Sequence, residues 1–147
     1  MKWVTRKAIR VNRVATAWLI RRFIDPHALF LFVEPEEVAD IQHREGATGF
    51  DALGATYPHT DDQGRCSFEA LAEEYCPGDA VLHELGRIVH GADFAEAIGL
   101  APESAGLRTI SQGFPLVAQH DQEIIEKAAF LYDALYAALA QRRKDNP

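Results

Sequence analysis

The sequence predicts an α+β fold, a predominantly helical single domain with a small β-sheet from the N-terminal half. The chain has 147 residues, of which 48% are apolar, which is enough for one domain with one hydrophobic core. Segments typical of strands fall in the first half, whereas helical periodicity dominates the second. No internal repeat or long linker divides the chain, so we expect one domain over residues 1–147.

The first elements alternate between strand and helix. Trp3-Val4-Thr5 favours a strand over residues 2–5. Asn12 can cap a helix that runs up to Pro26, because the residue before a proline avoids helical backbone angles. The apolar run 29–33 lies between two prolines and is typical of a buried strand. The apolar residues at helical spacing in the intervening helix are Val14, Ala15, Trp18, Leu19 and Phe23.

The next segments are shorter and more polar. Residues 36–44 favour a helix, with Gly46 suited to the position that follows a helix end. Residues 49–57 are expected to form a strand, a turn at Gly54 and a second strand. Residues 58–64 (PHTDDQG) are expected to form a polar loop.

Helices are expected to fill the rest of the chain. One covers 67–75, and Asp79 can cap the next, whose apolar stripe extends to Val89. Pro102 suits the first position of a further helix, which Gly113 can terminate. The longest helix is expected over 121–143, with a single apolar stripe.

Composition excludes several classes of protein. The net charge is −7 and the pI is near 5.3, although residues 1–22 carry seven basic residues and no acidic one. That segment lacks the cleavage site of a secretory signal, so we expect it to belong to the mature fold. No apolar run approaches the ~20 residues of a membrane span. The two cysteines form no CxxC motif, which favours a reducing cytoplasm.

The basic start suggests an anion site. Arg13, Arg21 and Arg22, with Trp18 among them, lie on the first predicted helix. Guanidinium groups pair with oxyanions through two parallel hydrogen bonds, so the cluster is a candidate site for a chromate-like or sulfate-like dianion. The alternative is a solvated face whose arginines pair with the many acidic residues. Direct DNA binding is not expected of an acidic chain without a recognised nucleic-acid motif.

A second group of residues can hold a metal. His59, Glu69, His90 and Asp93 are candidate ligands of Zn²⁺, Mn²⁺ or Fe²⁺, and Cys66 beside Glu69 would favour Zn²⁺. The alternative is structural: Glu69 and Asp93 as capping residues, His90 as a cation at a helix end and Cys66 as a small buried apolar residue. No nucleophile elbow, P-loop or dinucleotide-binding motif occurs.

Seven segments along the chain form one recognisable pattern. They are WVTR (3–6), NRVATAWLIRRFIDPHALFLFV (12–33), FDALG (50–54), CSFEAL (66–71), IVHGAD (88–93), LAPESAGL (100–107) and YDALYA (132–137). The long block from Asn12 to Val33 is the most specific of them. In this order the segments resemble a known family, the ChrB-type chromate-resistance domain.

This resemblance implies a bacterial cytoplasmic protein connected to chromate sensing and resistance. In longer ChrB-type proteins a similar domain follows an N-terminal regulatory region, so this chain is expected to act as a stand-alone sensor or accessory module. Asn12 stands where the family has an acidic residue, and the His90 position also takes arginine. Family-like residues are Arg13, Trp18, Arg21, Arg22, Asp25, Asp51, His59, Cys66, Glu69 and Asp93.

Three functional hypotheses follow. The first is a chromate-response domain that binds the oxyanion, a divalent metal, or both. The second is a small metal-dependent redox enzyme, in which Cys66 could reduce chromate through its thiolate. The third is an interaction module or homodimer that uses an exposed apolar patch on the C-terminal helix.

Overall fold

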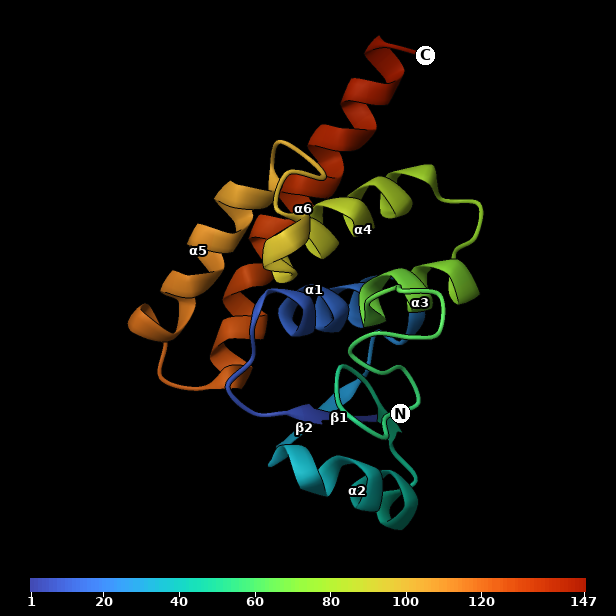
Figure 1. Cartoon of the computed structure of the whole chain (residues 1–147), viewed down its shortest axis with the longest axis vertical. Coiled ribbons are helices and arrows are strands. Elements are labelled where there is room, and N and C mark those ends of the chain that lie inside the picture. The colour runs from blue at the N-terminus through green and yellow to red at the C-terminus, as the bar shows by residue number, and fades with distance from the viewer.

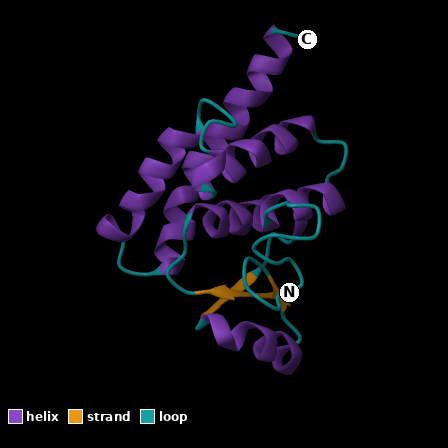
Figure 2. Ribbon diagram, in the orientation of Figure 1, coloured by secondary structure: helices purple, strands orange, loops and turns teal.

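Strand β1 (Lys2–Arg6) is the centre of a three-stranded parallel sheet. It pairs with β2 (Leu29–Val33) on one side and with the short β3 (Thr48–Gly49) on the other. Figures 1 and 2 show this computed structural model, which describes residues 1–147, with the sheet near one end of a mostly helical molecule. The predicted α+β class and the small N-terminal sheet are confirmed.

Helix α1 (Val11–Leu19) is buried on every side. It continues into a π-helical turn over Ile20–Ile24, which ends directly before the Asp25-Pro26 pair. The predicted cap at Asn12 is wrong, because Asn12 lies inside the helix and Arg10 occupies the capping position. The Asn12 amide instead donates to Ser67 Oγ at 2.9 Å, within the core.

Helix α2 (Val38–Glu45) covers the face of the sheet opposite α1, as Figure 1 shows. A short 3₁₀ turn over Pro35–Glu37 precedes it. Gly46 ends α2 with a φ of 63°, a left-handed conformation that favours glycine, so the predicted helix end is confirmed. A small separate core joins α2 to the sheet and comprises Val4, Val38, Ile41, Ala47 and Ala52.

The remaining helices form a layer with α1. They are α3 (Ser67–Tyr75), α4 (Ala80–Asp93), α5 (Ser104–Val117) and α6 (Asp121–Asp145). Helix α1 packs against α3, α4 and α6, and a core cluster of 27 buried residues fills the space between them. The Asp79 side chain caps α4, as predicted, by accepting from Leu82 N–H at 3.0 Å. No helix combines the length and apolar character needed to span a membrane.

Three further predictions of local structure are wrong. Residues 49–57 do not form two strands: β3 ends at Gly49, and only an isolated bridge joins Phe50 to Tyr57. The reason is Asp51, whose φ of 52° turns the chain out of the extended conformation. Helix α5 begins at Ser104 rather than Pro102 and runs on past Gly113. Glycine ends a helix readily only in the left-handed conformation, which Gly113 does not adopt.

Gly91 allows α4 and α5 to pack closely together. A Cβ atom at this position would lie 2.4 Å from Ser104 Oγ and 2.9 Å from the Ala97 carbonyl oxygen. We expect Gly91→Ala to destabilise the fold by about 1–3 kcal/mol through overpacking. Gly113→Ala is the matched control, because a Cβ there meets nothing within 4 Å. It should stabilise by about 0.5–1 kcal/mol. Urea unfolding of both variants checks the opposite signs.

Candidate functional site: a basic pocket and a neighbouring thiol cluster

A cavity of about 490 Å³ lies where the β1–α1 loop, the turn at Asp51 and the end of α4 meet. We call it the basic pocket, because four of its lining side chains are basic. The lining residues are Arg6, Lys7, Ala8, Arg10, Arg13, Pro35, Asp51, His59 and Asp93.

The end of β1 and the loop to α1 bring three of these basic residues to the pocket. Ala8 adopts a φ of 60°, which is uncommon for a residue other than glycine. The first residue of α6 holds the loop in this shape, since the two Asp121 carboxylate oxygens accept from Ala8 N–H and Ile9 N–H, each at 3.0 Å. Asp121 thus holds the loop that carries Lys7 and Arg10, while Arg6 reaches the pocket from the end of β1.

Arg13 reaches the pocket from inside the protein. Its side chain is only 5% exposed, and its Nε lies 3.5 Å from Asp51 Oδ2 without making a hydrogen bond. Another guanidinium nitrogen of Arg13 donates to the Ala8 carbonyl at 3.1 Å. Burial lowers the pKa of Arg13, and the Asp51 charge opposes that shift. Arg13 thus carries a buried cation that is only partly paired.

Asp51 is the anionic centre of the pocket and is 3% exposed. Arg6 binds it twice: Arg6 Nε donates to the Asp51 carbonyl at 2.7 Å, and its terminal nitrogen lies 3.3 Å from Oδ1. His59 Nδ1 lies 2.6 Å from the same Oδ1. This hydrogen bond raises the pKa of His59 above 6.5, although partial burial opposes the rise.

Asp93 faces His59 from the last turn of α4. Its Oδ2 lies 3.7 Å from His59 Nδ1, yet this buried oxygen accepts no hydrogen bond. Burial raises the pKa of Asp93, and the neighbouring Asp51 charge adds to the shift. The pocket therefore contains one unpartnered carboxylate oxygen as well as one unpartnered guanidinium nitrogen.

The pocket has an excess of positive charge. Four basic side chains and two carboxylates line it, and His59 adds a further charge when protonated. Lys7 also pairs with Glu34, which is not a lining residue. The Arg10 side chain is exposed and forms no ion pair, so its charge is free for a ligand. Guanidinium groups converging on a water-filled space are suited to a small oxyanion.

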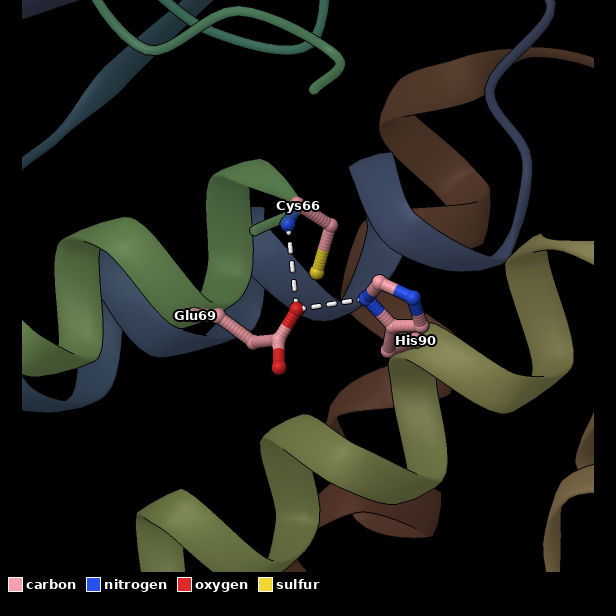
Figure 3. A group of neighbouring side chains, drawn as sticks. All are labelled: Cys66, Glu69 and His90. Carbon is pink, nitrogen blue, oxygen red and sulfur yellow. Dashed lines mark hydrogen bonds and ion pairs between the residues drawn. The ribbon is translucent and has the colours of Figure 1, made fainter. Parts of the chain in front are cut away.

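A second cluster, shown in Figure 3, lies where α3 and α4 meet, and we call it the thiol cluster. Its residues are Cys66, Glu69 and His90. Glu69 Oε1 accepts from Cys66 N–H at 3.0 Å and lies 2.6 Å from His90 Nδ1. The Cys66 sulfur projects toward the space between the Glu69 carboxylate and the His90 ring. Cys66 is fully buried, and burial raises the pKa of its thiol well above the usual value, so the thiol stays protonated at neutral pH.

The predicted metal ligands fall into two groups. His59 and Asp93 lie in the basic pocket, whereas Glu69 and His90 lie with Cys66. The Phe94 ring packs against both histidines, with its centroid 4.9 Å from His59 and 4.6 Å from His90. The two groups are thus neighbours with an aromatic ring between them.

The predicted arginine cluster is also divided. Arg13 lines the basic pocket, whereas Arg21 donates to the Ala28 carbonyl at 3.3 Å and lies over the Phe30 ring. Arg22 pairs with Asp133 at 3.1 Å, and Trp18 donates to the same carboxylate at 2.9 Å. The four residues share one helical segment but have different surroundings.

Sequence reasoning did not select Arg6, Lys7 and Arg10 as site residues. The observation that pointed to them is the acid-free basic stretch over residues 1–22, which contains all three. The family resemblance marks Asp51 only as a family-like position. Its role depends on a left-handed turn that helical spacing does not reveal.

Comparison with known proteins places the chain in a family. Residues 3–139 match the family described as ChrB, C-terminal domain. The chain is 37% identical over 146 residues to Protein ChrB of Cupriavidus metallidurans. That match covers 97% of this chain but only 42% of the length of the relative. No solved structure matches the chain. The chain belongs to the ChrB C-terminal domain family, as its resemblance to ChrB-type chromate-resistance domains implied.

Proposed function

We propose that this domain contributes to chromate resistance by binding a small tetrahedral oxyanion, chromate or a chemically similar dianion, in the basic pocket. The family membership supports a role related to chromate resistance. The observation that carries the proposal is Arg13, a buried arginine that lines the pocket and whose Nε makes no hydrogen bond. A buried cation that is only partly paired costs free energy, and an anion in the cavity would reduce that cost.

The pocket suits a dianion that several cations share. Arg6 and Arg13 already share Asp51, so their positions are fixed before a ligand arrives. Arg10 is exposed and unpaired and can close over the bound anion. Chromate and sulfate have the same shape and charge, so both are expected to bind. An anion that contacts both the β1–α1 loop and α1 would favour the conformation of the loop that holds it. This shift in conformation would signal that the anion is bound.

The alternative in which Cys66 reduces chromate receives less support. Reduction by a cysteine requires a thiolate in contact with the oxidant, whereas the Cys66 thiol is buried and its pKa is raised. The interaction-module alternative required an apolar patch on the last helix. Phe130, 81% exposed, is the one large apolar side chain of α6 that is strongly exposed, which is too little for such a patch.

Isothermal titration with chromate and with sulfate tests the proposal. Arg10→Gln should weaken binding of either anion by about tenfold, because it removes one charge-assisted contact without disturbing the core. Arg22→Gln is the matched control: Arg22 is equally a surface arginine but pairs with Asp133 outside the pocket. It should leave the affinity unchanged. Wild-type protein that binds neither anion at millimolar concentration, or equal losses in both variants, would contradict the proposal.

Anion binding should depend on pH through His59. The folded protein holds the pKa of His59 above 6.5, mainly through the hydrogen bond to Asp51. Protonated His59 adds positive charge to the pocket, so sulfate affinity should fall as the pH rises through the raised pKa of His59. Sulfate is the probe because it remains a dianion while His59 titrates. In His59→Gln the fall should disappear, whereas it should persist in His27→Gln, which alters an exposed histidine outside the pocket.

Asp93→Asn should raise both the anion affinity and the free energy of unfolding at pH 7. Burial holds the pKa of Asp93 in the folded state above the usual 3.8, so ionising it costs the folded state free energy at neutral pH. Removing that cost should stabilise the protein by about 1 kcal/mol, with the gain vanishing as the pH falls below 4. Asp62→Asn, at an exposed position without an ion pair, should change neither quantity. Urea unfolding at several pH values measures the stability, and sulfate titration measures the affinity. If Asp93→Asn is less stable than the wild type at pH 7, this account of Asp93 is wrong.

A further inference from the structure

The cluster of Cys66, Glu69 and His90 brings together three different kinds of metal ligand. One ligand atom from each residue lies within 4.8 Å of the others. The three residues come from the start of α3 and the last turn of α4, and Figure 3 shows their side chains turned toward a common space. Thiolate, carboxylate and imidazole are the donor groups of protein zinc sites.

The packing of α3 against α4 makes room for this arrangement. Gly86 faces Glu69, and a Cβ at position 86 would lie 3.2 Å from Glu69 Cγ. Any larger residue there would press on the Glu69 side chain that reaches between Cys66 and His90. The side chains of Glu69 and His90 are 24% and 21% exposed, so an ion can reach the cluster from solvent.

Helix capping alone does not account for the cysteine. Cys66 occupies the N-cap of α3, where its sulfur accepts from the backbone of Glu69, and Glu69 accepts from Cys66 N–H in return. Serine, threonine, aspartate and asparagine are the residues that stabilise this position, whereas sulfur is a weak acceptor. Cys66 also packs in the main core as a small apolar residue. Beside a histidine and a glutamate, its sulfur is in addition available as a soft metal ligand.

We propose that Cys66, Glu69 and His90 form a site for a divalent metal ion of the Zn²⁺ type, with a fourth coordination position open to water. On binding, the Cys66 thiol transfers its proton to solvent and the thiolate sulfur coordinates the ion. The thiolate and the Glu69 carboxylate together balance the charge of the ion, which suits a partly buried site. The oxidation states of sulfur and metal do not change. The site is separate from the basic pocket, with the Phe94 ring between them.

The experiment uses the whole chain, stripped of metal with a chelator and kept reduced with a phosphine. Titration with Co²⁺ should give one equivalent of binding with a sulfur-to-cobalt charge-transfer band, which Zn²⁺ then displaces. Cys66→Ser should abolish the band and weaken Zn²⁺ binding by more than about 100-fold, the upper figure for loss of a mere outer-shell partner. Because serine is a favoured N-cap residue, this variant should remain folded, which circular dichroism checks.

Two matched controls lie nearby. Cys76→Ser removes the other cysteine, which follows α3 at its far end, and His83→Gln removes a histidine two turns earlier on α4. Both variants should keep the cobalt band and the zinc affinity, whereas Glu69→Gln and His90→Gln should lose affinity. The proposal is overturned if folded wild-type protein gives no sulfur-to-cobalt band, or if Cys66→Ser and Cys76→Ser give the same spectrum. Neither result bears on anion binding, so the two proposals fail independently.

Discussion

The buried pairing of Arg13 with Asp51 is the constraint on which the basic pocket depends. Arg13 lies on a helix without an exposed face, so its charge must be balanced within the protein. Asp51 supplies that balance only because the chain turns through a left-handed conformation at this residue. Asp51 also binds Arg6 and His59, so one carboxylate is shared among three basic groups. Because three basic groups share one carboxylate, the lining of the cavity carries excess positive charge.

The last turn of α4 joins the basic pocket to the thiol cluster. His90 points to Glu69 on α3, whereas Asp93, three residues later, points to His59. Phe94, which follows the helix, packs its ring against both histidines. The two groups of polar side chains are therefore built on a single element that the core holds through α1, α3, α5 and α6.

The sequence was informative where the relevant interactions are local. Helical spacing located the helices, and Gly46 and Asp79 marked two helix ends that the structure confirms. The pairing of Cys66 with Glu69 also follows from a separation of three residues at a helix start. The basic pocket depends instead on contacts between distant segments. Residues 13 and 51 are brought together by the sheet and by a turn that we expected to be a strand, and the π-helical turn at Ile20–Ile24 gives Arg21 and Arg22 different partners.

The most direct measurement of the central claim is the Nε–H resonance of Arg13 in ¹H–¹⁵N correlation spectra during titration with sulfate and with chromate. This donor has no hydrogen-bond partner in the free protein. If the anion binds where the excess charge lies, the Arg13 resonance should shift in a saturable manner with both anions, while that of Arg22 stays in place. An unmoved Arg13 resonance at anion concentrations that shift Arg21 and Arg22 would contradict the account.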